Sequence, residues 1–385
     1  KKKTTRTMMI RSAVALCLLL LPESSLAFVA PRAGYTTRTN VLTQSTSDDI
    51  NEPIRSIRDD DEEGTMNRRS FFVGSGLAAA SALLLPNVAL AEDSSIGSSK
   101  DHPIVVLGAG GKVGKLCTQI LADSGKYVSA TTRSGRDVFD GSSASPYVTF
   151  ASADVTKLDS LEAALKGASG VIFAASASGK KKGGDPAHVD YLGVYNTAKA
   201  CLAAGVPKLA VVSAGTVSRP DSAGFKATNF FVKYVYGEKV MDYKIAGESA
   251  MRDLYAGQSA CGYTVVRPGG LNDKPSVGSS KVHVSQGDVY SSEISRTDVA
   301  LVTVAALLKG KATDGTTFEL NQVEGVGKAM DSLPTPPTEL VHAGASTFDG
   351  LLDGLLTDAQ LKSKYGDLIN DSFKGSGIEP VTSLV

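Results

Sequence analysis

Short apolar runs alternate with longer amphipathic segments through the middle of the chain. Strands are predicted where apolar residues run together, and helices where they recur every three or four positions. The predicted strands cover residues 104–107, 127–132, 147–150, 170–174, 208–212, 263–267 and 317–320, and the predicted helices cover residues 113–121, 159–165, 189–204, 231–255 and 297–308. Because most connections between these strands are long enough to carry a helix, the pattern predicts an α/β fold with a doubly wound parallel sheet.

The pattern changes beyond Gly327. Prolines 334, 336 and 337 mark a linker, and leucines at helical spacing follow within residues 351–373. We therefore expect one α/β domain over residues 92–327. Residues 328–385 should form a linker and a small C-terminal helical appendage.

The first 91 residues have the composition of targeting signals, which are excluded from fold reasoning. An apolar run over residues 12–21 follows Arg11 and precedes a small-residue cleavage pattern, as in a secretory signal peptide. Residues 28–47 hold arginine, serine and threonine without an acidic residue, as in a plastid transit peptide. The two together resemble the bipartite leader of proteins that enter plastids of secondary origin.

A further leader resembles a twin-arginine signal, with Arg68 and Arg69 before an apolar stretch over residues 73–85 and Ala89-Leu90-Ala91 at its end. This stretch is shorter than the ~20 residues that a spanning helix needs, so no stable transmembrane segment is expected in the mature form. We expect a plastid protein delivered to the thylakoid lumen. A thylakoid anchor or a stromal location is the alternative.

Charge and metal-ligand spacing exclude two classes of partner. Forty basic and forty acidic residues leave a formal net charge of zero, so nothing favours nucleic acid as a partner. The four histidines and four cysteines are scattered along the chain without the spacing of a metal site or a disulfide framework. We expect neither a metal nor a nucleic acid.

Glycines cluster directly after the first predicted strand. The segment Gly108-Ala109-Gly110-Gly111-Lys112-Val113-Gly114 has the spacing G-x-x-G-x-x-G and leads into a predicted helix. Glycine lets such a turn tighten and bring backbone N–H groups against a pyrophosphate, and Gly114 permits close packing of helix and strand. The context of strand, turn and helix predicts a Rossmann-type dinucleotide site, the alternative being a purely structural turn.

The end of the second predicted strand bears on which dinucleotide binds. An acidic residue there would accept a hydrogen bond from the ribose 2′-hydroxyl of NAD, but the sequence is Thr131-Thr132-Arg133-Ser134. A guanidinium at Arg133 suits a 2′-phosphate. The sequence therefore favours NADP, with NAD as the alternative.

At this point the chain resembles the atypical branch of the short-chain dehydrogenase/reductase superfamily, with NmrA-like and plastid-envelope-like relatives. The resemblance rests on several segments that follow one another in the family's order from about residue 103 to 322. They include Val189-Asp190-Tyr191-Leu192-Gly193 and Val266-Arg267-Pro268-Gly269-Gly270. The resemblance implies that Asp154 and Val155 meet the adenine. It also implies that the cofactor is flanked by Ala174, Ala175, Ser176 and Pro268.

The resemblance implies a serine after the fifth strand and a later Tyr-x-x-x-Lys as catalytic groups, the lysine lowering the tyrosine pKa. Ser213 occupies the serine position, and Lys244 is the best match to the lysine, but Val240 stands where the tyrosine would be. Glu248 lies one helical turn after Lys244 and could pair with it. Tyr195 and Lys199 have the required spacing but precede Ser213, so we interpret them as a coincidence.

A displaced hydroxyl could come from Tyr234, Tyr236 or Tyr243, among which the sequence does not choose. Two functions therefore stay open. The first is an NADP-dependent oxidoreductase of a small carbonyl or enone compound, with Lys244 and Ser213 as catalytic residues. The second is a non-catalytic NADP-binding factor that assembles or regulates thylakoid protein complexes.

Overall fold

The fold is described by a computed structural model over residues 95–141, 145–178, 184–232, 239–288, 290–323, 337–366 and 378–384. The predicted leaders, most of the proline-rich linker, and Tyr234 and Tyr236 lie outside these residues. Within the described part of the chain, no helix combines the length and the apolar character that a membrane crossing needs.

A mostly parallel sheet forms the centre of the domain and confirms the predicted α/β class. In the described residues it has nine strands in the order β11-β8-β10-β6-β5-β4-β1-β2-β3, and the seven from β10 to β3 run parallel. The parallel strands are β1 (Ile104–Leu107), β2 (Val128–Thr132), β3 (Val148–Ser152), β4 (Gly170–Phe173), β5 (Lys208–Val212), β6 (Gly262–Pro268) and β10 (Thr316–Gln322). The order reverses between β1 and β4, where the ligand crevice of such sheets lies.

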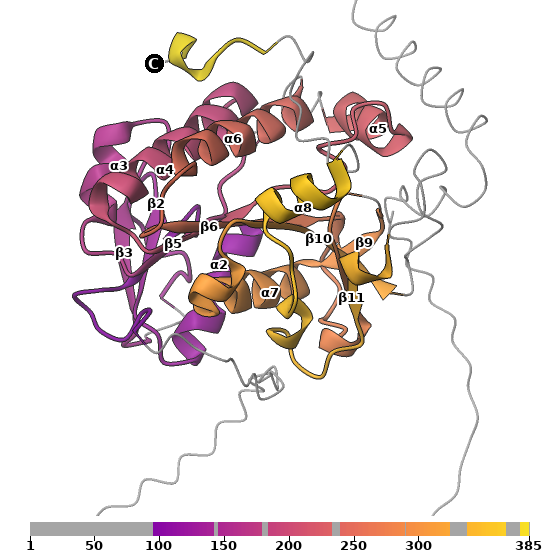
Figure 1. Ribbon diagram of the computed structural model, residues 1–385. Coiled ribbons are helices and arrows are strands. Elements are labelled where there is room, and N and C mark those ends of the chain that lie inside the picture. The colour runs from indigo at the N-terminus through magenta and orange to yellow at the C-terminus, as the bar shows by residue number, and fades with distance from the viewer. Residues whose placement is uncertain are drawn as a thin grey trace, which may run out of the picture. The chain divides into compact units, whose positions relative to one another are not determined.

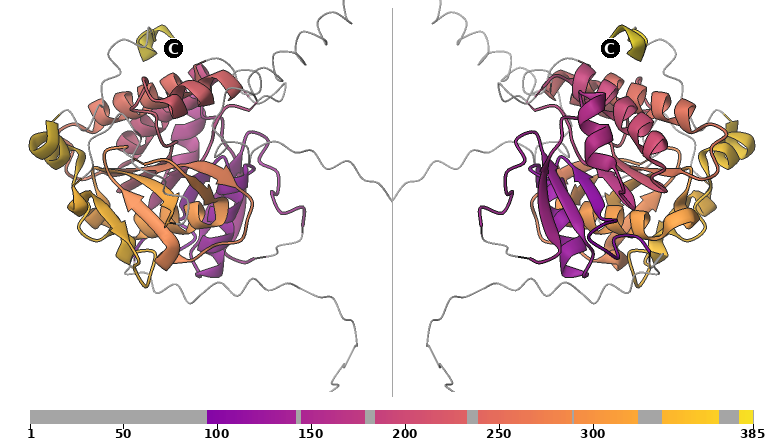
Figure 2. Two further views of the ribbon diagram at one scale, coloured as in Figure 1. Left: turned by 90° about the vertical axis from the view of Figure 1, so that its right-hand side faces the viewer. Right: turned by 90° about the vertical axis from the view of Figure 1, so that its left-hand side faces the viewer.

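Helices cover both faces of the sheet (Figures 1 and 2). One face carries α2 (Lys112–Asp123) and α7 (Arg296–Leu308), and the other carries α3 (Leu158–Leu165), α4 (Gly193–Ala204) and α6 (Val240–Tyr255). Along β1 the side chains alternate between the two faces. Ile104 and Val106 pack into the core on the side of α2 and α7, and Val105 and Leu107 pack into the core on the side of α3, α4 and α6. Both faces are buried, which is why the strands appear in the sequence as continuous apolar runs.

Two helical predictions differ from the structure in detail. The helix predicted over residues 231–255 is two helices, α5 (Ala223–Val232) and α6, and α6 begins after Lys239, whose φ of 57° is left-handed. Asn229 of α5 caps the new start by accepting a hydrogen bond from the Met241 backbone N–H at 3.1 Å. The helix predicted from residue 189 begins with a π-helical turn over Ala187–Leu192, which continues into α4.

The C-terminal segment contains a helix in the expected range, α8 (Asp358–Tyr365), and it also contributes a strand to the sheet. Residues 341–343 form β11 (Val341–Ala343), which pairs with β8 (Val282–Ser285) and extends the sheet in antiparallel orientation. Leu351 and Leu352 are buried in the same hydrophobic core as the apolar side chains of α7. The three-residue strand β11 is too short to show a pattern, as are β7 (Gly270–Asn272) and β9 (Glu293–Ser295), which pair with each other. Strand β8 is as long as β1 but lacks the unbroken apolar run by which β1 was recognised.

A partly buried carboxylate attaches the final α-helix, α8 (Asp358–Tyr365), to the domain. The Asp358 Oδ2 atom accepts hydrogen bonds from Arg252 Nε at 2.8 Å, Tyr263 Oη at 2.9 Å and Thr317 Oγ1 at 2.8 Å. These donors come from α6, β6 and β10. One side chain therefore ties the C-terminal segment to three elements of the α/β domain.

We predict that Asp358→Asn lowers the free energy of unfolding by about 2–3 kcal/mol, because Arg252 then lacks a partly buried charge partner. Urea denaturation measures the effect. Asp353→Asn is the matched control, since Asp353 is 73% exposed and its ion pair with Lys309 should contribute less than about 1 kcal/mol. Equal losses in the two variants would contradict this role for Asp358.

Candidate dinucleotide site

The turn between β1 and α2 requires glycine at two positions. Gly108 has a φ of 82°, and a Cβ on it would lie 2.7 Å from the backbone nitrogen of Ala175. A Cβ on Gly114 would collide with the carbonyl oxygen of Gly108. The turn is thus pressed against the end of β4, and α2 begins with no side chain capping its N-terminal N–H groups. This cradle fits a pyrophosphate, which accepts hydrogen bonds from such groups.

Lys112 follows the turn and takes part in an exposed cluster that the sequence did not predict. Its ammonium lies 2.5 Å from the carboxylate of Asp273, which also pairs with Arg296 at 2.6 Å. Arg296 is the first residue of α7, so the cluster joins the starts of α7 and α2. Val113 is half-buried beside the core of this face.

The ends of β2 and β3 carry the residues predicted to meet the adenosine half. Arg133 is exposed directly after β2, and Ser152 Oγ donates to its carbonyl oxygen at 2.9 Å. Asp154 follows β3, and its carboxylate accepts hydrogen bonds from the backbone N–H and hydroxyl of Thr156 at 3.1 and 2.8 Å. Val155 is buried against Gly193. All of these lie at the carboxyl edge of the sheet, the edge that also bears the glycine turn.

A buried carboxylate, Asp190, lies on the π-helical turn Ala187–Leu192 and contacts the segment that follows β4. It is 1% exposed and accepts hydrogen bonds from Ser176 Oγ at 2.7 Å, Ala177 N at 2.9 Å and Lys244 Nζ at 2.6 Å. The sequence placed Ser176 and Lys244 in the site but assigned Asp190 no role. The one available signal was an acidic residue in an otherwise apolar helical segment.

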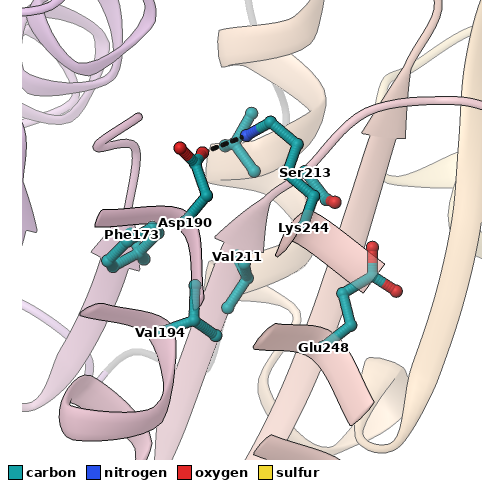
Figure 3. Close-up of a pocket in the computed structure, with 8 residues that line it drawn as sticks. Phe173, Asp190, Val194, Val211, Ser213, Lys244 and Glu248 are labelled. Carbon is teal, nitrogen blue, oxygen red and sulfur yellow. Dashed lines mark hydrogen bonds and ion pairs between the residues drawn. The ribbon is translucent and has the colours of Figure 1, made fainter. Parts of the chain in front are cut away.

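Lys244 and Ser213 line one small pocket (Figure 3). The pocket lies between the ends of β4 and β5 and the helices α4 and α6, and its other walls are Phe173, Asp190, Val194, Val211, Val212 and Glu248. The Lys244 side chain is 13% exposed. The predicted catalytic pair is therefore together, and Pro268 ends β6 beside it, its carbonyl oxygen accepting from Gly215 N at 2.7 Å.

The predicted pairing of Glu248 with Lys244 is wrong. Figure 3 shows the Lys244 amine directed to Asp190 and away from Glu248. Glu248 instead binds two guanidinium groups, Arg267 Nη2 at 2.6 Å and Arg252 Nη2 at 2.9 Å. Burial alone would raise the pKa of Glu248, but the two arginines outweigh it and lower the pKa to about 2.

No tyrosine belongs to the described residues that line this pocket. Val240, at the tyrosine position, is buried in an apolar cluster with Val217 and Phe225. The Tyr243 ring packs beside Tyr191 at 6.4 Å between centroids. Lys199 is exposed on α4 and does not line the pocket, which agrees with its Tyr-x-x-x-Lys spacing being coincidental. In the described part of the chain, no group of three or more His, Cys, Asp or Glu side chains could hold a metal ion.

The match to a family model agrees with the glycine turn at the end of β1. Residues 108–309 match a protein family described as NAD(P)H-binding. The chain is 29% identical over 218 residues to an uncharacterised chloroplastic protein of Arabidopsis thaliana, covering 56% of this chain and 75% of the relative. It is 24% identical over 220 residues to an uncharacterised sugar epimerase of Bacillus subtilis, covering 57% and 94%. A crystal structure of an oxidoreductase from Lactococcus lactis matches with a TM-score of 0.45 at 23% identity, covering 59% of this chain and 92% of that one.

We predict that Gly114→Ala weakens NADPH binding about fivefold or more, because relieving the collision with the Gly108 carbonyl oxygen costs about 1–3 kcal/mol and shifts the turn. Isothermal titration calorimetry gives the dissociation constant. Gly224→Ala is the matched control, since Gly224 lies on α5 outside the turn and a Cβ there would touch only the Thr216 side chain at 3.4 Å. A similar loss in both variants would argue against the pyrophosphate cradle.

Proposed function

The chain belongs to the NAD(P)H-binding family, and we propose that it is an NADP(H)-dependent oxidoreductase of a small carbonyl or enone compound. The observation that carries the proposal is the Lys244 ammonium, held 2.6 Å from Asp190 at the sheet edge that bears the glycine turn. A cofactor cradle and an oriented cation at one edge are what hydride transfer to a polarised carbonyl needs.

Different residues of the chain bind different parts of the cofactor and the substrate. The glycine turn holds the pyrophosphate, and the exposed Arg133 guanidinium binds the 2′-phosphate that distinguishes NADP from NAD. When bound, the reduced nicotinamide supplies the hydride. A lysine ammonium has three N–H donors, and within the described residues Lys244 directs one of them to Asp190. The others can bind a ribose hydroxyl and stabilise negative charge on the substrate oxygen.

The missing tyrosine does not require a non-catalytic protein. The Lys244 ammonium can itself give a proton to the substrate oxygen and recover one from solvent, with Ser213 as a second hydrogen-bond donor. The alternative, an NADP-binding factor for thylakoid complexes, rests on Val240 at the tyrosine position and on the expected lumenal address, whose signal over residues 67–91 lies outside the described residues. A purely structural role would also give no reason to hold a lysine ammonium at the ligand edge.

The proposal includes a plastid location. It is supported by the composition of residues 28–47 and by the chloroplastic relative from Arabidopsis. Delivery to the thylakoid lumen rests on residues 67–91 alone, which lie outside the described residues. Removal of residues 1–91 and a nucleotide-binding domain over residues 92–327 form part of the same proposal.

We expect Arg133→Ala to weaken NADPH binding by about tenfold or more while leaving NADH binding unchanged, because a charge-assisted hydrogen bond contributes about 1.5–3 kcal/mol. Dissociation constants for both nucleotides, measured by calorimetry, give the ratio. Arg136→Ala is the control, because Arg136 is a second exposed arginine in the same loop. If the two variants change the NADPH to NADH ratio equally, Arg133 does not select the cofactor.

Lys244→Met should lower kcat by about 100-fold, the range expected for losing an oxyanion-stabilising or proton-donating group. The assay follows NADPH absorbance with a panel of aldehydes, ketones, quinones and enones. Lys199→Met removes an exposed lysine of the same sequence spacing and should leave kcat unchanged. If the wild-type protein binds NADPH but consumes none with any class in the panel, the oxidoreductase proposal is wrong.

A further inference from the structure

Asp190 is a charged side chain in an enclosed place. Its carboxylate has no exposed surface, and burying a carboxylate is unfavourable unless hydrogen bonds and a counter-charge replace water. The structure supplies both, through the Ser176 hydroxyl, the Ala177 backbone N–H and the Lys244 ammonium. Asp190 thus connects two elements beside the pocket that Ser213 lines. One is the segment that follows β4, and the other is α6.

The backbone around Asp190 is built to bring these groups together. Asp190 lies within the π-helical turn Ala187–Leu192, a rare form that re-aims side chains and occurs often at functional sites. Helix α6 approaches this turn closely at Gly247, where a Cβ would collide with the Asp190 carbonyl oxygen. Lys244 lies three residues earlier on the same helix. The close approach is what allows its ammonium to reach the buried carboxylate.

The carboxylate also sets the direction of the neighbouring hydrogen bonds. An ionised Asp only accepts hydrogen bonds, so the Ser176 hydroxyl must donate its one hydrogen to Asp190. Toward a ligand, Ser176 can then act only as an acceptor. The Lys244 ammonium can offer a ligand only N–H donors. The edge therefore presents one acceptor and one cationic donor, both attached to the same carboxylate.

This pair of groups matches a hydroxyl better than a phosphate. A hydroxyl both donates and accepts, so the hydroxyls of a ribose can satisfy Ser176 and Lys244 together, whereas an ionised phosphate oxygen can only accept. We propose that Asp190 is a positioning residue. It orients Ser176 and Lys244 so that together they bind the hydroxyls of the nicotinamide-side ribose. This inference rests on the proposed function, because it takes NADP(H) as the bound dinucleotide.

The test compares two ligands on the full-length protein. NADPH contains the nicotinamide-side ribose, and 2′,5′-ADP contains only the adenosine half. Asp190→Asn should weaken NADPH binding about tenfold or more, because the amide loses the counter-charge of Lys244 and can donate to Ser176. Binding of 2′,5′-ADP should stay unchanged. Equal losses for both ligands, or no loss for NADPH, would overturn the inference.

A double-mutant cycle separates positioning from general stability. In a Lys244→Met background, Asp190→Asn should cause much less further loss of NADPH affinity than it causes in the wild-type background, because Asp190 then has no ammonium to position. Additive losses would show that Asp190 acts independently of Lys244. Asp185→Asn is the matched control and should leave both ligands unaffected, since Asp185 precedes the same turn but is exposed and pairs with His188.

Ser176→Ala keeps the inference testable if Asp190→Asn does not fold. It removes the acceptor and leaves the ion pair of Asp190 with Lys244 in place, so NADPH affinity should fall about fivefold or more with 2′,5′-ADP unaffected. Unchanged NADPH affinity in this variant would overturn the inference alone. A wild-type protein that binds 2′,5′-ADP and NADPH equally well also contradicts it, whereas one that binds neither overturns the proposed function.

Discussion

The buried Glu248 carboxylate constrains the whole α6 side of the domain. It is 1% exposed, so its charge must be balanced inside the protein, and Arg252 and Arg267 provide the balance from α6 and β6. Arg252 extends the contact to Asp358 and thereby to α8. These bonds orient the Glu248 side of α6 toward β6. Because Lys244 precedes Glu248 by one turn, that orientation also determines where the lysine ammonium lies.

Helix α6 therefore carries two separate polar systems. A lysine and a glutamate four residues apart on an exposed helix would gain a few tenths of a kcal/mol by pairing. Here Glu248 finds two guanidinium groups, which bind carboxylates with more donors and better geometry than one ammonium does. Lys244 is left to Asp190, with which it forms a pair at the mouth of the site. The structural network and the ligand-facing pair lie side by side without competing.

The sequence predicted those parts of the site that depend on neighbours in the chain. The turn from Gly108 to Gly114 is local, and its glycines are required by contacts that recur wherever β1, α2 and β4 meet, so its place could be inferred directly. The partnership of Asp190 with Lys244 spans 54 residues and depends on a π-helical turn and a close approach at Gly247, none of which has a local pattern. The strands β8 and β11 were missed because β11 has only three residues and β8 alternates apolar with polar residues over only four.

Glu319 shows why the structural network can remain separate from the ligand edge. It lies on β10 beside Arg267, 1% exposed, and burial together with the nearby Asp288 raises the pKa of its carboxyl to about 8. At neutral pH it is thus mainly uncharged. Arg252, Arg267 and Arg219 are then balanced by Glu248, Asp358 and Asp288, one negative charge for each positive charge. A network balanced in this way exerts little net electrostatic force on Lys244. The charge that a ligand meets at the sheet edge is therefore set by Lys244 and Asp190.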